Sequence, residues 1–309
     1  MRSPVDSEFA ASQNHIPMNT RPTFDDFLAV RRADPQLARL THDVALPRSY
    51  GVEFGPGRTP LALPESLSVR YIDHYPGCEV EGMIDHVWNG SGSLATVLGE
   101  EKLLDFAIAR LFAHRVPNLL GWFRGIFEGL RPGGVLNLTL PDKRMTGDVL
   151  RTASTIGDLF EADHLGLVRP SFRQKFDHRS LSVAIAPGQR WREGVDETGM
   201  PRISVQDALA FARAASDGPS VDDAECHCWV FTPLSFLDAL EQLSRARQFP
   251  FVISQFATTD PGSSEFFVCL RHDHVTDPDR LLHRQQVAIN HVRAIVLERR
   301  RRSKLMASE

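Results

Sequence analysis

The chain has 309 residues, of which 42% are hydrophobic and 24% charged, with 21 glycines and 20 prolines. This composition is typical of a globular protein, and it excludes collagen-like, coiled-coil and fully disordered chains. The formal net charge of −4 argues against a nucleic-acid binder, because such proteins are normally basic. A basic run over residues 298–304 is the exception, and we interpret it as a helix C-terminus, where cations are favoured.

No apolar run reaches the roughly 18–20 residues that are needed to span a bilayer. The first 14 residues lack the basic flank, apolar stretch and cleavage site of a signal peptide. With four cysteines and no export signal, a disulfide framework is not expected. We therefore expect a cytoplasmic protein that has neither a membrane nor a nucleic acid as its partner.

The first half of the chain predicts a parallel sheet. Residues 23–40 indicate two short helices that are broken at Pro35, with Thr23 as a cap. Short apolar runs then alternate with helical patterns, which is typical of βαβ units. Strands are predicted over residues 49–54, 68–72, 83–88, 104–109 and 135–140, and a helix over 119–130.

The second half predicts a cap and a closing part of the sheet. Residues 142–225 are polar and irregular apart from one amphipathic helix over 205–215, and a long irregular insertion of this kind is usually a functional lid. A helix over 233–247 precedes two strands, 251–256 and 265–271, whose short glycine-containing connection predicts an antiparallel pair.

A last helix over residues 277–305 carries a partial apolar stripe, which packs either on the domain or on a second subunit. We expect a homodimer through this helix. The domain organisation that follows from these elements comprises an N-terminal helical extension (1–47), a cofactor-binding core (48–142), a substrate cap (143–225), a closing part of the core (226–272) and a C-terminal helix with a basic tail (273–309).

A glycine-containing loop follows the first strand. Gly55 and Gly57 would let the backbone approach a ligand closely, and a helix after them would offer free N–H groups, although Gly-Pro-Gly is also an ordinary turn. Asp73 ends the second strand, where a carboxylate can accept hydrogen bonds from ribose hydroxyls. The third glycine of a dinucleotide site is missing, so a nucleoside without phosphates is the expected ligand.

Several runs resemble class I S-adenosylmethionine-dependent methyltransferases. They are Asp-Phe-Ala-Ile-Ala at 105–109, Gly-Trp at 121–122 and Leu-Arg-Pro-Gly-Gly-Val-Leu at 130–136. The resemblance covers residues 48–142. Further runs at 141–144, 176–178, 227–233 and 265–268 resemble a bacterial subgroup of methyltransferase-domain proteins.

The resemblance implies an α/β fold: a Rossmann-like class I methyltransferase sheet with an antiparallel closing strand pair, a helical N-terminal extension and an inserted cap. It implies S-adenosylmethionine as the cofactor. Carried over to this chain, the methionine-side loop is formed by Glu53, Gly55 and Gly57, the ribose is held by Asp73, and the adenine is flanked by Asn89 and Gly90. Arg110 stands where relatives have a polar residue beside the methyl group.

The implied activity is methyl transfer to oxygen or nitrogen of a small molecule, in bacterial specialised metabolism. Residues 110–115 depart from the family pattern, because Arg110 and Leu111 replace a polar pair and His114 replaces an acid. This departure leaves two alternatives open. One is a cofactor-binding enzyme with a non-methylating reaction, such as a cyclisation or rearrangement, and the other is a non-catalytic interaction module.

Three residues are candidates for the general base that methyl transfer sometimes needs. His178 and His227 lie in the segment expected to cover the carboxyl edge of the sheet, and Asp142 ends the fifth strand. The alternative for His227 is a structural role, in which the ring packs against Trp229 and bonds to backbone.

The run Cys226-His227-Cys228 is the sequence's one suggestion of a metal ligand set, completed by His178 or His164. Alternation along an extended segment places both thiols on one face and His227 on the other. A second closely spaced ligand pair, typical of structural zinc sites, is missing. The sequence therefore predicts no metal site.

Overall fold

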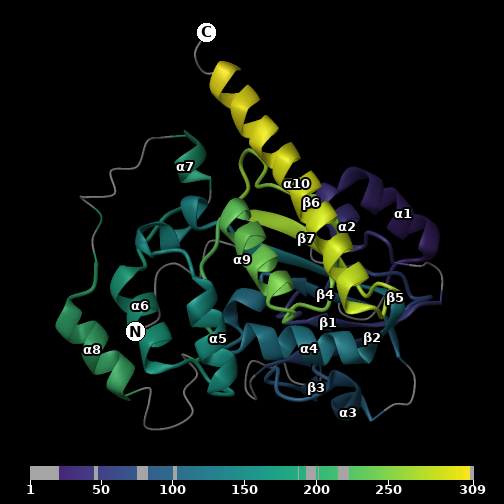
Figure 1. The fold of residues 1–309 in the computed structure, drawn as a ribbon, viewed down its shortest axis with the longest axis horizontal. Coiled ribbons are helices and arrows are strands. Elements are labelled where there is room, and N and C mark those ends of the chain that lie inside the picture. Colours follow the sequence, from purple (N-terminus) through teal and green to yellow (C-terminus); the bar gives the residue numbers. More distant parts are fainter. Residues whose placement is uncertain are drawn as a thin grey trace.

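A mixed sheet organises the chain in the computed structural model (Figure 1). The structure describes residues 21–44, 48–74, 83–99, 103–186, 188–192, 200, 202–214 and 223–306. Within them the seven strands are β1 (Tyr50–Phe54), β2 (Ser68–Asp73), β3 (His86–Val87), β4 (Leu104–Arg110), β5 (Leu130–Pro141), β6 (Val252–Ala257) and β7 (Glu265–Arg271).

The strand order is β3-β2-β1-β4-β5-β7-β6. The first five of these pair in parallel, whereas β7 is antiparallel to both β5 and β6. The predicted antiparallel closing pair is thus confirmed, and so is the Rossmann-like class I methyltransferase sheet. In such a sheet the carboxyl ends of the parallel strands meet at one edge, which is where ligands bind in open α/β folds.

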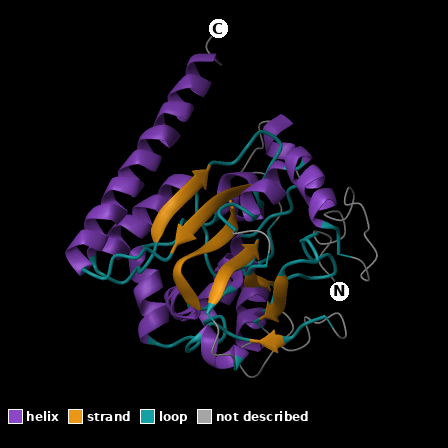
Figure 2. Cartoon of the chain, turned by 90° about the vertical axis from the view of Figure 1, so that its right-hand side faces the viewer, coloured by secondary structure: helices purple, strands orange, loops and turns teal. Residues whose placement is uncertain are grey.

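Helices cover both faces of the sheet (Figure 2). They are α1 (Phe24–Ala33), α2 (Pro35–Leu40), α3 (Leu94–Leu98), α4 (Leu119–Gly129), α5 (Ile156–His164), α6 (Phe172–Leu181), α7 (Gln189–Arg192), α8 (Val205–Ala214), α9 (Pro233–Arg245) and α10 (Pro278–Met306). Three short 3₁₀ turns, η1 (Ala113–Arg115), η2 (Lys143–Met145) and η3 (Gly147–Leu150), follow the ends of β4 and β5. The predicted break at Pro35 and the Thr23 cap are confirmed.

Two hydrophobic cores result, one on each face of the sheet. The larger packs α3, α4, α9 and α10 against alternate residues of the strands, such as Val52, Ala107 and Leu138. The smaller packs Phe27 and Leu40 of α1 and α2 against the opposite set, which includes Phe106, Ile108 and Phe267. The alternation follows from the two-residue period of a strand, and it leaves the carboxyl edge of the sheet to be covered by other segments.

The connection from β1 to β2 corrects one expectation. Residues 55–67 form a loop without a helix, so the free N–H groups of a helix N-terminus that we expected beside Gly57 are not there. The physical reason lies in three prolines of this short segment, Pro56, Pro60 and Pro64, which restrict the backbone and remove hydrogen-bond donors.

The strand predicted over residues 83–88 is shorter than expected. Only His86 and Val87 pair, with Ile72 and Asp73 of β2, because β3 is an edge strand with a single neighbour. Residues 1–20 of the predicted N-terminal extension lie outside the described residues.

The segment predicted as a cap leaves the sheet after β5 and carries α5 to α8, which lie together on the left of Figure 1, away from α1 and α2. It returns at Phe231, which forms a parallel bridge with Asp142 directly beyond the end of β5. Residues 226–231 therefore run along the carboxyl edge of the sheet. Their backbone is also tied to the turn after β4, because Trp229 N donates to His114 O at 3.0 Å.

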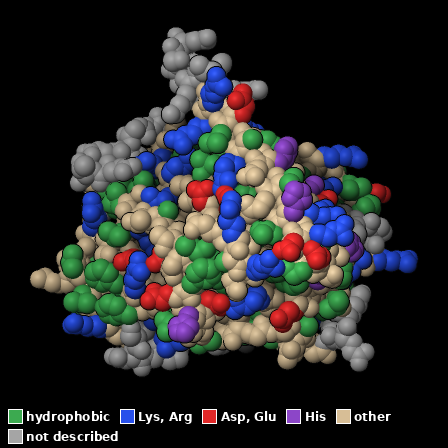
Figure 3. Space-filling view, viewed as in Figure 1, with side chains coloured by type: hydrophobic (Ala, Val, Ile, Leu, Met, Phe, Trp, Pro, Cys, Tyr) green, Lys and Arg blue, Asp and Glu red, His purple; other side chains and the backbone are tan. Residues whose placement is uncertain are grey.

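The last helix, α10, packs Ile289 and Val296 into the larger core and leaves Val287, Ile295 and Leu297 exposed. Its basic run lies near the C-terminal end. The space-filling view shows Lys and Arg side chains (blue) spread over this face together with Asp and Glu side chains (red) (Figure 3). Among the described residues, no helix is both long enough and apolar enough to cross a membrane.

Candidate functional site

Glu53 lies at the carboxyl end of β1 and is almost fully buried, with 1% of its surface exposed. Leu61 N in the following loop donates to both carboxylate oxygens, at 3.0 and 3.2 Å. Burial raises the pKa of Glu53 to about 7, although the Leu61 hydrogen bond and the charge of Arg110 act in the opposite direction. Glu53 therefore fixes the loop that was expected to hold a cofactor.

Glu53 should make the stability of the protein depend on pH. Because its folded-state pKa is raised, the unfolded chain releases the proton first, and the stability present below the unfolded pKa is lost as the pH rises through about 7. The loss should reach about 3 kcal/mol above pH 8. Urea unfolding of the Glu53→Gln variant should lack this decline, whereas the exposed control Glu65→Gln should follow wild type. A wild-type-like pH profile in Glu53→Gln would contradict the assignment.

Aromatic side chains fill the space beside the glycine-containing loop and Asp73. Gly55 has a φ of +60°, and a Cβ added there would lie 2.5 Å from Cδ2 of Phe112. The Phe112 ring stacks on Phe54 and meets the edge of the His74 ring, with centroids 5.5 and 4.9 Å apart. The Asp73 carboxylate is buried and accepts from the backbone and Nδ1 of His74, at 2.7 and 2.9 Å.

The other residues expected at the cofactor lie at the same edge. Asn89 and Gly90 follow β3, and the Asn89 side chain accepts from Ser91 N at 3.0 Å. Arg110 ends β4 and donates to Thr59 O in the loop after β1, at 3.2 Å. The next residue, Leu111, has a φ of +49°, and this turn directs Phe112 back toward Gly55. Gly57 is exposed, with open space around its Cα.

A second group of polar side chains gathers beyond the ends of β4 and β5. His227 Nδ1 lies 2.6 Å from Oδ2 of Asp148, and the other oxygen of that buried carboxylate accepts from Arg151 at 2.9 Å. The ring of His178, from α6, lies 5.0 Å from that of His227. Asp148, His178 and His227, which we call the histidine–aspartate cluster, each offer a ligand atom within 4.8 Å of the others.

Electrostatics keep this group in a defined protonation pattern. Burial raises the pKa of Asp148, but the charge and hydrogen bond of His227 and the charge of Arg151 together hold it well below its ordinary value. Burial and the neighbouring His227 lower the pKa of His178. The carboxylate is therefore ionised at neutral pH and His178 is neutral, so that lone pairs of both are available to a ligand.

A third histidine borders the cluster. His114 lies in η1, directly after β4, and its ring is 4.5 Å from that of His227. It is 2% exposed, and burial together with His227 holds its pKa well below the ordinary value. Its Nδ1 has no hydrogen-bond partner among the described residues. His114 stands only two residues after Phe112, so the cluster adjoins the space expected for the cofactor.

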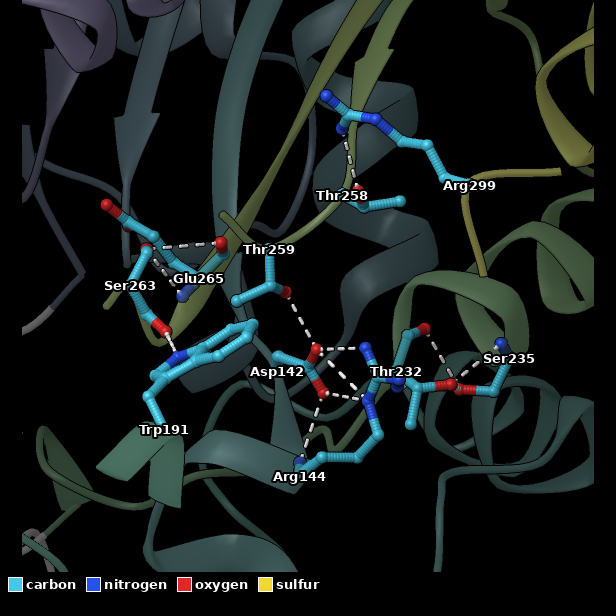
Figure 4. Close-up of polar contacts among 10 residues, drawn as sticks. All are labelled: Asp142, Arg144, Trp191, Thr232, Ser235, Thr258, Thr259, Ser263, Glu265 and Arg299. Atoms are coloured by element: carbon cyan, nitrogen blue, oxygen red, sulfur yellow. Dashed lines mark hydrogen bonds and ion pairs between the residues drawn. The ribbon is translucent and has the colours of Figure 1, made fainter. Parts of the chain in front are cut away.

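Of the three candidate bases, His178 and His227 lie together, whereas Asp142 contacts other residues. Asp142 is fully buried, and its partners in the described part of the chain are Arg144 and Thr259, with Thr259 Oγ1 donating at 2.7 Å (Figure 4). It anchors the connection after β5. Asp148, six residues later, is the carboxylate that reaches His227, and no local pattern in the sequence marks it.

The basic residues of the cap are paired with acids of the same chain. Arg151 pairs with Asp148, and both Arg169 and Lys175 pair with the buried Asp223. The aromatic side chains of this region differ in burial. Trp229, Phe231 and Phe236 are buried in the core, whereas Phe172 and Trp191 are partly exposed. Cys226 and Cys228 are buried and His227 is partly exposed, which confirms the predicted alternation.

A scan against models of known protein families found no match, and a search of curated proteins found none either. Solved structures do match in part. An S-adenosylmethionine-dependent methyltransferase from Clostridium acetobutylicum is 9% identical, with 81% of this chain and 99% of that chain covered and a TM-score of 0.42. The CurJ carbon methyltransferase is 11% identical, with 81% and 56% covered and a TM-score of 0.38.

Another match is a candidate hemolysin from Lactococcus lactis, which is 10% identical, with 86% of this chain and 99% of that chain covered and a TM-score of 0.36. At these TM-scores the likenesses carry no argument about activity. The strand order and the antiparallel β5–β7 and β6–β7 pairs are what define the fold as a Rossmann-like class I methyltransferase sheet.

Proposed function

We propose that the chain is an S-adenosylmethionine-dependent methyltransferase that acts on an oxygen or nitrogen of a small molecule. The observation that carries the proposal is the position of the histidine–aspartate cluster. It lies beyond the ends of β4 and β5, and β4 pairs with β1, the strand that carries Glu53. A proton-accepting group thus adjoins the edge at which a nucleoside would bind.

The residues that the resemblance assigns to the cofactor lie at the carboxyl ends of β1 and β2 and in the loops after β1 and β3, which supports the proposal. Glu53, Gly55 and Gly57 would hold the methionine side, Asp73 the ribose, and Asn89 with Gly90 the adenine. When bound, the cofactor supplies an electrophilic methyl group. The fit requires two side chains to rotate, since Phe112 covers Gly55 and His74 occupies the Asp73 carboxylate.

The chain's own residues then act on the acceptor. Asp148 orients the His227 ring through Nδ1, which leaves Nε2 to face a ligand. An imidazole in this position can take the proton of an acceptor hydroxyl or amine, and the cap would hold that acceptor in line with the methyl group. Arg151 fixes the Asp148 carboxylate from the other side.

Calorimetric titration with S-adenosylmethionine and with its demethylated product tests the proposal. Wild type should bind both, and Asp73→Asn should weaken binding at least about tenfold, because the ribose loses a charged acceptor. Asp85→Asn is the control, since Asp85 is an exposed carboxylate that lies before β3, beside Tyr71 of β2. No binding at millimolar ligand would contradict the proposal.

A second candidate is a non-methylating reaction, such as a cyclisation or rearrangement, at the same cluster. It is favoured by the Phe112 ring that lies on Gly55, because this arrangement fills the methionine side of the space. A product-mass assay separates the two candidates. A mass gain of one methyl group supports the first, and a product of unchanged mass supports the second.

A further inference from the structure

We infer that the histidine–aspartate cluster is a binding site for a divalent transition-metal ion. Asp148, His178 and His227 supply two nitrogen ligands and one oxygen ligand from three separate segments of the chain, η3, α6 and the strand-like return of the cap. This inference concerns the site of the proposed function and relies on it only for the catalytic role of the ion.

The spacing of the ligand atoms fits an ion after small side-chain rotations. The three atoms lie within 4.8 Å of one another, and atoms that share a zinc ion with bonds of about 2.0–2.2 Å are about 3–3.5 Å apart. His178 and His227 are partly exposed, so an ion can reach them from solvent. Three protein ligands leave at least one coordination position open, as in catalytic zinc sites.

The groups behind the ligands are arranged as outer-shell partners of a metal site. Arg151 donates to Oδ1 of Asp148, and Oδ2 lies 2.6 Å from Nδ1 of His227, so an ion at Oδ2 would take the place of that hydrogen bond. Ser182 Oγ lies 3.4 Å from Nδ1 of His178, which leaves Nε2 for the same purpose. Metal-bound carboxylates and imidazoles are usually held by such second contacts, which fix their orientation.

His114 is an independent observation that points to a ligand. Its ring lies 4.5 Å from that of His227, it is 2% exposed, and its Nδ1 has no hydrogen-bond partner among the described residues. A buried polar atom without a partner is costly, and a ligand bound in the cluster would relieve that cost directly or through a bound water.

The charges select the kind of ion. The cluster has one carboxylate, and two arginines, Arg151 and Arg115, are close enough to depress the pKa of His178. Mg²⁺ and Ca²⁺ depend on several oxygen ligands and are disfavoured in such surroundings. Imidazole nitrogens suit Zn²⁺, Fe²⁺ or Co²⁺ instead. With the ion bound, His227 is a ligand and not the proton acceptor, and the ion itself would hold an acceptor through its hydroxyl oxygen and make that proton easier to remove.

His227 and His178 were part of the ligand set weighed from the sequence, but Asp148 was not, because it lies 79 positions from His227 and is marked by no motif. The Cys226 and Cys228 thiols are buried, on the side of the segment opposite to His227. Burial and the contact with Cys226 keep the pKa of Cys228 well above its ordinary value. In the proposed site a carboxylate oxygen of Asp148 is the third ligand, in place of the cysteine thiols that the sequence suggested.

The test uses the full chain, free of affinity tags, after treatment with a chelator. Titration with Co²⁺ should give visible d–d absorption that saturates at about one ion per chain, and Zn²⁺ should displace it and raise the thermal unfolding temperature. His178→Ala and His227→Ala should each weaken Co²⁺ binding at least about 100-fold. The control His164→Ala, an exposed histidine of α5, should bind as wild type does.

Two results would overturn the inference. One is the lack of saturable Co²⁺ absorption in wild type, and the other is equal affinity in wild type and His227→Ala, which shows adventitious binding elsewhere. Circular dichroism of each variant establishes that it is folded, and the Zn²⁺-dependent rise in unfolding temperature gives a second readout. Calorimetry with S-adenosylmethionine on the same samples keeps the two hypotheses apart, because cofactor binding without metal binding contradicts only this inference.

Discussion

Replacing Asp148 with alanine should lower the free energy of unfolding by about 3–5 kcal/mol, measured by urea denaturation with a chelator present. The carboxylate is 3% exposed and holds both Arg151, itself 5% exposed, and His227. Its removal leaves a buried guanidinium without its charge partner, which costs far more than the loss of an ordinary hydrogen bond.

The control for this prediction is Asp279→Ala, which removes the partner of Arg247. Both members of that pair are exposed, at 81% and 55%, so the change should stay within about 1 kcal/mol of wild type. If Asp148→Ala were no more destabilising than Asp279→Ala, the Asp148–Arg151–His227 contacts would not be the anchor of the cluster, and the geometry proposed for the site would be wrong.

Replacing Phe112 with alanine should have two opposite effects. The side chain is 3% exposed and packs on Phe54, so its loss should reduce the free energy of unfolding by about 3–5 kcal/mol. The same change uncovers Gly55 and frees His74, and it should therefore increase the affinity for S-adenosylmethionine at least about tenfold, since the protein no longer has to move the ring before binding.

Phe236→Ala is the matched control for Phe112→Ala. Phe236 is equally buried but belongs to α9, where it packs on Phe231. It should show a comparable loss of stability and unchanged affinity in calorimetric titration. Equal or weaker binding of the cofactor by Phe112→Ala would show that the ring does not obstruct the site.

Much of the fold was predictable because local signals agree with one another. Proline and glycine residues mark the end of α4 and the bend into β5, and β4 is an apolar run that suits a strand buried on both faces. The antiparallel pair β6–β7 was predictable from its short connection. The lack of a helix after β1 could also have been predicted from the three prolines of that segment, but we gave more weight to its glycines.

The site was predictable only in part, and the reason is physical. His178 and His227 could be selected because imidazole titrates near neutral pH and both fall in the cap region. Whether Asp142 or Asp148 can contact His227 depends on which carboxylate already accepts hydrogen bonds from neighbouring side chains. Arg144 and Thr259 occupy Asp142, whereas Asp148 reaches His227 across 79 residues of sequence, and such long-range pairing leaves no periodic trace.

The bridge between Asp142 and Phe231 brings together the two points at which the chain departs from the sheet and returns to it. An insertion whose ends are already joined can lengthen or shorten with only a slowly growing entropic cost. Two of the three residues of the cluster, Asp148 and His178, belong to that insertion, while His227 lies at its return. Exchange of the insertion between related chains would therefore transfer acceptor choice and reactive groups as one unit, with the sheet left intact.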